Sequence, residues 1–115
     1  MEQNPVVRFP FGPATVVQLG ASGTETIEIQ NALTILDGAS TQATGARTID
    51  LVIPDDLPIG AHLVVKHKTA AQETLTPGEG MVGNVITGVA SKTHVAEYMY
   101  DGNNFVQLAE ALQID

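Results

Sequence analysis

The fold is decided by residues 48–53, which read Thr-Ile-Asp-Leu-Val-Ile. Ile49, Leu51 and Ile53 stand at every second position, so they would share one face of a β-strand. Residues 26–30 (Thr-Ile-Glu-Ile-Gln) repeat the pattern. A period of two predicts strands that bury one face against a common core.

Six further segments are rich in Val, Ile and Thr, the residues that favour strands. They are residues 14–19, 32–36, 61–68, 84–90, 93–100 and 105–109. Gly, Pro, Asp and Asn gather between the predicted strands, a composition typical of turns. These turns are residues 20–23, 37–38, 54–58, 76–78 and 101–104.

Two stretches are predicted to lie outside the strands. Residues 38–46 are rich in small side chains and are predicted to form a loop, and only residues 108–114 could form a helical turn. The lack of long helical periodicity disfavours a parallel α/β fold, whose crossovers need helices. We therefore expect an all-β fold, an antiparallel β-sandwich or jelly roll, as a single domain over residues 14–115.

Residues 1–13 are predicted to form an extended N-terminal arm. Pro5, Pro10 and Pro13 remove backbone donors that a helix or central strand would need. Exposed apolar side chains need a surface to pack on, and that surface is either a neighbouring subunit or the arm's own domain. The candidate residues for binding that surface are Val6, Val7, Arg8, Phe9 and Phe11.

Composition narrows the classes of function. The chain has 115 residues, 43% of them hydrophobic, and a formal net charge of −8. This composition disfavours intrinsic disorder, and the charge disfavours nucleic acid as a partner. The N-terminus lacks the pattern of a signal peptide, and no apolar run approaches the roughly 18 residues of a membrane span. We expect a protein that is made in the cytoplasm and does not bind a membrane.

A glycine pattern at residues 78–83 matches G-x-G-x-x-G, the signature of dinucleotide-binding loops. That role requires a strand before the glycines and a helix after them. Thr76-Pro77 precedes the pattern, and residues 84–87 after it look like a strand. We interpret the segment as a glycine-rich turn or bulge.

Histidine and carboxylate side chains raise the question of a metal site. His62, His67 and Glu73 are metal-ligand types, but positions 62 and 67 face opposite sides of a strand. The spacing instead predicts one half-buried histidine with a hydrogen-bond partner and one surface histidine. His94 stands on a separate predicted strand. We expect no metal site and no cofactor, and the roles of the three histidines stay open.

Acidic turns are a second place where a cation could bind. Asp55, Asp56 and Asp101 could offer oxygen ligands to calcium, although Asp also forms turns by bonding its own backbone. The turn interpretation is favoured, because the pattern of a calcium-binding loop is absent. The chain has no Cys that could act as a nucleophile, and its Ser, His and Asp residues show no pattern of a catalytic triad. We therefore expect a protein that is not an enzyme.

Tyr98 and Tyr100 lie two positions apart on one predicted strand, so they share a face. Two aromatic rings on one face could form a ligand-binding platform for a sugar. The alternative is a packed sheet face or subunit contact in which Tyr100 stands opposite Phe105. Because aromatic residues make up only 4% of the chain, packing is the favoured interpretation.

The last quarter of the chain carries a family resemblance. Residues 97–108 read Glu-Tyr-Met-Tyr-Asp-Gly-Asn-Asn-Phe-Val-Gln-Leu. The segment resembles the closing hairpin of small β-rich virion structural proteins of tailed bacteriophages, which read aromatic-x-aromatic-Asp-Gly-x-x-aromatic. Residues 24–27 and 57–65 are similar in style to such modules. The resemblance implies a head decoration protein, a head-fibre base or a small tail component, usually a homo-oligomer and often a trimer.

Resemblance and composition together define the expected function. We expect a capsid decoration protein on the outer surface of a virion, whose partner is the major capsid protein or another virion protein. Its arm would bury apolar surface at joints between shell subunits. The alternative is a glycan- or receptor-binding β-module of a phage fibre or tail, with Tyr98 and Tyr100 as contacts.

Overall fold

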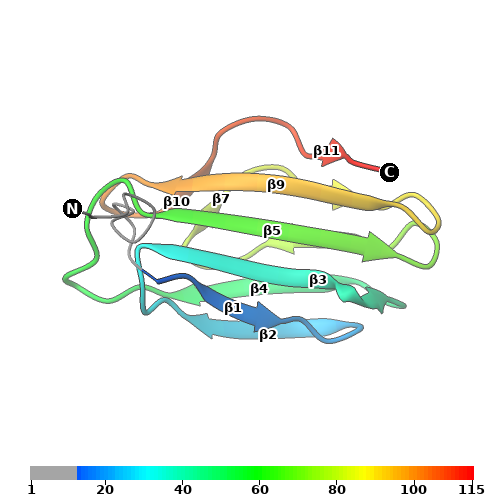
Figure 1. The fold of residues 1–115 in the computed structure, drawn as a ribbon, viewed down its shortest axis with the longest axis horizontal. Coiled ribbons are helices and arrows are strands. Elements are labelled where there is room, and N and C mark those ends of the chain that lie inside the picture. Colours follow the sequence, from blue (N-terminus) through cyan, green and yellow to red (C-terminus); the bar gives the residue numbers. More distant parts are fainter. Residues whose placement is uncertain (1–12) are drawn as a thin grey trace, which may run out of the picture.

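The computed structural model describes residues 13–115, and every regular element in this range is a β-strand (Figure 1). The prediction of an all-β fold is therefore confirmed. The strands are β1 Thr15–Gln18, β2 Gly23–Glu28, β3 Leu33–Ala43, β4 Arg47–Val52, β5 His62–Thr69, β6 Thr74–Pro77, β7 Met81–Val82, β8 Ile86–Thr87, β9 Thr93–Tyr100, β10 Phe105–Gln107 and β11 Leu112–Gln113.

The strands form two mixed sheets. Sheet A has the order β1-β3-β5-β9-β10-β7, and β11 also pairs with β9. Sheet B has the order β2-β4-β6-β8. From β1 to β6 the chain therefore alternates between the two sheets, one strand at a time (Figure 1).

Strand direction differs from the antiparallel arrangement expected from sequence. In sheet A, β1, β3 and β5 run parallel, and in sheet B so do β2, β4 and β6. Parallel neighbours need a long crossover, most often a helix. Here a strand of the opposite sheet is the crossover, so parallel pairing arises without helices. Antiparallel pairing enters where β9 pairs with β5, and β9 and β10 form a hairpin.

One hydrophobic core lies between the sheets. Sheet B contributes Ile27, Ile49 and Leu51, which confirms their predicted alternation. Sheet A contributes Leu36, Leu63, Val65, Tyr98 and Phe105 to the same cluster. The side chains of β5 alternate between half-buried and buried along its whole length. Each sheet therefore depends on the other for the burial of its inner face.

Several strands and loops have different bounds from those predicted. The loop predicted over residues 38–46 is wrong over most of its length, because β3 continues to Ala43 with a register shift after Gly38. Residues 108–114 contain β11 instead of a helical turn. Residues 74–77 and 81–82 form the short strands β6 and β7. Neither strand was predicted, because both segments adjoin or contain residues typical of turns. Small or turn-forming residues can extend a strand when a neighbouring strand supplies the hydrogen bonds.

Candidate functional site

A buried arginine connects several segments of the core. Arg47 is 1% exposed, and its Nε donates to the carbonyl of Gly20 at 2.9 Å. Its Nη1 donates to the carbonyl of Gly38 at 3.0 Å, and its Nη2 donates to that of Thr41. Burial lowers the pKa of Arg47, and the negative charges of nearby acidic side chains oppose that shift. A buried guanidinium needs such acceptors, so Arg47 ties the first turns of the fold together.

His67 completes this network. Its Nδ1 lies 3.2 Å from Nη1 of Arg47, and its Nε2 lies 2.9 Å from the carbonyl oxygen of Glu73. A neutral ring fits both contacts, with Nδ1 as acceptor and Nε2–H as donor. Burial lowers the pKa of His67, and the nearby charge of Arg47 lowers it further. Because the ring is fully buried, its role is structural.

The other two histidines face different surroundings. His62 lies on the opposite face of β5 from His67, as the strand spacing predicted, and is half-buried. His94 stands directly across from His67 on β9, on the inner side of sheet A. Among residues 13–115, no three His, Asp or Glu side chains gather closely enough to hold a metal ion.

The acidic turns are held by their own backbone. Asp55 and Asp56 are the central residues of a turn in which Leu57 N donates to the carbonyl of Pro54 at 3.3 Å. The carboxylate of Asp101 accepts from the amides of Asn103 and Asn104, each at 2.8 Å. These bonds, that of Asn104 first, lower the pKa of Asp101. Turn formation therefore accounts for the Asp101 carboxylate, and Asp55 and Asp56 lie within a backbone turn.

The glycine pattern at residues 78–83 forms a turn that leads into β7, and no helix follows it. Gly78 N donates to the carbonyl of Ile49 at 2.7 Å, so the chain passes close to β4. A Cβ on Gly78 would lie 2.0 Å from Oδ1 of Asp50. Close packing against β4 explains this glycine.

The two tyrosines share the inner face of β9, as predicted, and both are buried. Tyr98 is 0% exposed and Tyr100 is 8% exposed. Tyr100 lies opposite Phe105, with ring centroids 5.3 Å apart, and its hydroxyl donates to the carbonyl of Gly102. Burial raises the pKa of Tyr98 to about 12. The favoured packing interpretation describes this pair, because neither ring offers an exposed face for a sugar.

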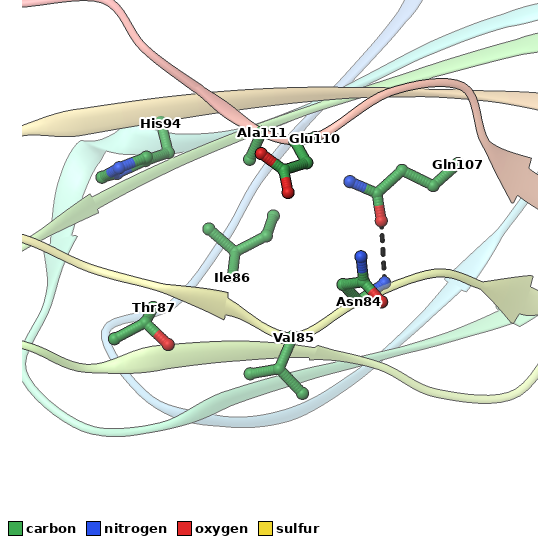
Figure 2. Close-up of a pocket in the computed structure, with 8 residues that line it drawn as sticks. All are labelled: Asn84, Val85, Ile86, Thr87, His94, Gln107, Glu110 and Ala111. Atoms are coloured by element: carbon green, nitrogen blue, oxygen red, sulfur yellow. Dashed lines mark hydrogen bonds between the residues drawn. The ribbon is translucent and has the colours of Figure 1, made fainter.

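A polar cavity of about 270 Å³ lies between β8, β9 and the C-terminal segment (Figure 2). In Figure 2, His94 lies at one end of the cavity, and Asn84 and Gln107 lie at the other. Gln107 Oε1 accepts from the amide of Asn84 at 2.8 Å. Within the described residues, Nδ1 of His94 is buried and has no hydrogen-bond partner. The lining residues are Asn84, Val85, Ile86, Thr87, His94, Gln107, Glu110 and Ala111.

An apolar groove of about 440 Å³ lies on the other face of sheet A. Its floor is formed by Val95 and Glu97 of β9, which point away from the core. Its walls come from Leu108, Ala109, Glu110, Leu112 and Ile114. We call these seven residues the C-terminal groove. Leu108, Leu112 and Ile114 are 49%, 67% and 56% exposed.

Sequence reasoning missed the C-terminal groove. A signal was present, because Leu112 and Ile114 alternate with Gln113 and Asp115, as on a strand with one apolar face. The segment was too short to distinguish this period from a helical turn. The candidate binding residues Val6, Val7, Arg8, Phe9 and Phe11 lie outside the described residues.

Comparison with known proteins found no similar protein. No family model matches the chain, and neither the curated proteins nor the solved structures contain a match. Residues 13–115 contain no helix that is long and apolar enough to cross a membrane.

Proposed function

We propose that the protein is a non-enzymatic virion structural protein, a decoration protein that binds the outer surface of a capsid and stabilises the shell. The observation that carries the proposal is the exposed apolar surface of the C-terminal groove, where Leu108, Leu112 and Ile114 lie together. Clustered exposed aliphatic side chains mark sites of contact between proteins. The hairpin of residues 97–108 also has the turn that the resemblance to phage virion modules implies.

The proposed domain is a two-layer β-sandwich with the N-terminal arm attached at β1. A sandwich is a rigid support from which an arm and a groove can both reach neighbouring subunits. Burial of each apolar arm side chain would contribute about 1.5–3 kcal/mol before ordering costs. Many symmetry-related copies would add these contributions across a shell. We propose a homo-oligomer, with a trimer as the favoured state.

The deciding experiment is deletion of residues 1–13, followed by binding to capsids that lack the protein. We expect the truncated chain to keep its circular dichroism spectrum and its urea midpoint but to lose most capsid binding. The matched control is Val52→Ser, which changes an exposed aliphatic residue on β4 of sheet B. Unchanged attachment of the truncated chain would contradict the proposal.

A second candidate is a glycan- or receptor-binding module of a fibre or tail. The polar cavity beside His94 favours it, because Asn84, His94 and Glu110 offer several groups to sugar hydroxyls. In this reading the ligand contacts are the cavity residues in place of Tyr98 and Tyr100. Binding on a glycan array that is lost in His94→Ala and kept in His62→Ala would support this function.

A further inference from the structure

The C-terminal groove is a preformed structure with fixed walls. At one end of the wall, Leu108 N donates to the carbonyl of Glu97 at 3.0 Å. At the other end, Ile114 N donates to the carbonyl of Thr93, also at 3.0 Å, and the amide of Thr93 donates to the side chain of Asp115 at 2.7 Å. Between these points residues 109–111 bulge away from β9. The groove volume of about 440 Å³ lies in the range of roughly 300–1,000 Å³ typical of binding sites.

The chemistry of the C-terminal groove defines its occupant. Five of its seven residues are aliphatic, and the other two, Glu97 and Glu110, carry exposed carboxylates. Such a groove fits an extended apolar segment that carries one positive charge. A negatively charged segment would be repelled by these two carboxylates and by the net charge of −8 on the whole chain.

One segment of this chain has that chemistry. Arg8 is flanked on both sides by large apolar residues, Val7 and Phe9, in the sequence Val-Val-Arg-Phe. The other four cations are placed differently. Arg47 is buried, and Lys92 lies in the turn before β9. Lys66 and Lys68 lie on β5, where the residues next to them in sequence are buried in the core. Charge and hydrophobicity therefore both select residues 6–11.

Reach alone does not select the copy that supplies the segment. The floor of the C-terminal groove lies on β9, three strand spacings from β1 in the order β1-β3-β5-β9, which is about 14 Å. Phe9 precedes Thr15, the first residue of β1, by six residues, so the chain between them can span about 20 Å. The arm of the same chain and the arm of a second copy are both long enough, and the proposed role of the arm in joining subunits selects the second copy.

We propose that the C-terminal groove binds residues 6–11 of a second copy of this chain, with Val7 and Phe9 against its aliphatic side chains and Arg8 attracted by the exposed carboxylates of Glu97 and Glu110. The proposal rests on the proposed role of the arm in joining neighbouring subunits, and it names the surface that receives the arm. Each copy then offers one arm and one groove. Such a head-to-tail contact closes into a ring when the rotation between copies allows it.

Site-directed cross-linking tests the contact, since the chain has no Cys. A full-length Phe9→Cys chain is mixed with a full-length Leu112→Cys chain under a mild oxidant. We expect a disulfide-linked pair that contains one chain of each kind. It should form at least about tenfold faster than with Val52→Cys as the partner, because docking raises the local concentration of the two thiols.

Two results of this experiment would overturn the proposal. One is cross-linking of Phe9→Cys to Leu112→Cys at the same rate as to Val52→Cys, a residue of similar exposure on sheet B. The other is closure of the double variant Phe9→Cys/Leu112→Cys into a cross-linked monomer in dilute solution. That outcome would place the arm on its own domain.

Charge reversal tests the role of Arg8 independently. Arg8→Glu should weaken self-association about two- to fivefold at low salt, the range of an exposed ion pair. Adding Glu97→Arg and Glu110→Arg to the same chain should restore it. The readout is solution mass by sedimentation over a concentration series. Equal weakening by Arg8→Gln and Arg8→Glu, with no restoration, would contradict the pairing.

Failure of this inference can be separated from failure of the proposed function. Leu112→Asn and Ile114→Asn should reduce self-association, because both side chains are exposed and line the C-terminal groove. If these variants associate normally while deletion of residues 1–13 still abolishes capsid binding, the arm has another receptor and this inference is wrong. If they dissociate while capsid binding is unaffected by the deletion, the groove assignment stands and the decoration role is wrong.

Discussion

At the scale of single residues, Arg47 is the side chain on which the most segments depend. Its guanidinium reaches the backbone at Gly20, Gly38 and Thr41 and the ring of His67. A charge in the core is stable only when such partners surround it. Removal of one partner would leave a buried N–H group of Arg47 without a hydrogen bond, which destabilises the fold. Sequence did not reveal this role, because one isolated arginine resembles any surface cation.

Gly38 gives the first prediction. A Cβ at this position would lie 2.4 Å from the carbonyl oxygen of Lys66 and 2.5 Å from Nη1 of Arg47. Gly38→Ala should therefore lower the free energy of unfolding by about 1–3 kcal/mol through overpacking, as measured by urea denaturation. Gly20→Ala is the matched control, since its Cβ would meet the movable carboxylate of Glu25 at 3.1 Å. Equal effects of the two changes would contradict this reasoning.

His67 gives a prediction about pH. Burial lowers the pKa of His67 below its ordinary value in the folded state, so the unfolded chain binds this proton more readily. The free energy of unfolding should keep its full His67 contribution above about pH 6.5 and lose it as the pH falls below that value. Urea midpoints measured from pH 8 to pH 5 should show the decline, and His67→Leu should flatten it. An equally steep decline in His67→Leu would show that another group is responsible.

At the scale of elements, the β9–β10 hairpin is the part of the fold that sequence predicted best. Strand 93–100 has the predicted bounds, and Tyr100 pairs with Phe105 across a turn of residues 101–104. Turn chemistry is local, so it can be read from neighbouring residues. The boundaries of β3 and β6 could not be read, because their hydrogen bonds come from strands distant in sequence.

Gly102 tests the turn of this hairpin. Its φ of 103° lies in the region that side chains rarely adopt, while its added Cβ would make only ordinary contact with Ile59 at 3.4 Å. Gly102→Ala should therefore cost about 1–2 kcal/mol from backbone conformation alone, measured as a lower urea midpoint. Asn103→Ala in the same turn should change stability by less than about 0.5 kcal/mol. Comparable losses in both variants would indicate that packing, not conformation, sets the cost.

The candidate sites show the same division between local and distant information. The face shared by Tyr98 and Tyr100 was predictable from a spacing of two, but their burial was not, because it depends on sheet B. The opposite directions of His62 and His67 followed from a spacing of five. The C-terminal groove depends on how residues 108–114 rejoin β9, which their composition does not indicate.

At the scale of the whole molecule, the two sheets share a single core, so neither can be stable alone. Leu63 of sheet A and Ile49 of sheet B are both 0% exposed and belong to one cluster. Mutual burial of this kind makes unfolding of a small domain cooperative. The molecule should therefore unfold in one step, with β4 and β5 lost together.

Leu63→Ala tests this cooperativity. It should lower the free energy of unfolding by about 2–5 kcal/mol through loss of burial and creation of a cavity. Hydrogen exchange should show the slowest amides of β4 losing as much protection as those of β5, although only sheet A carries the change. Protection that falls in sheet A alone would reveal two independently unfolding layers.

The pairing order of the strands has a consequence for synthesis of the chain. Within residues 13–115, β9 and β10 are the only consecutive strands that pair with each other. Each of β1 to β7 has a partner that is made at least two elements later, so its pairing is completed only after further strands have left the ribosome. The hairpin emerges near the end and closes fast, and the long-range pairings then follow slowly. One edge of β5 therefore stays open to chaperones and proteases until translation has passed β9, its later partner.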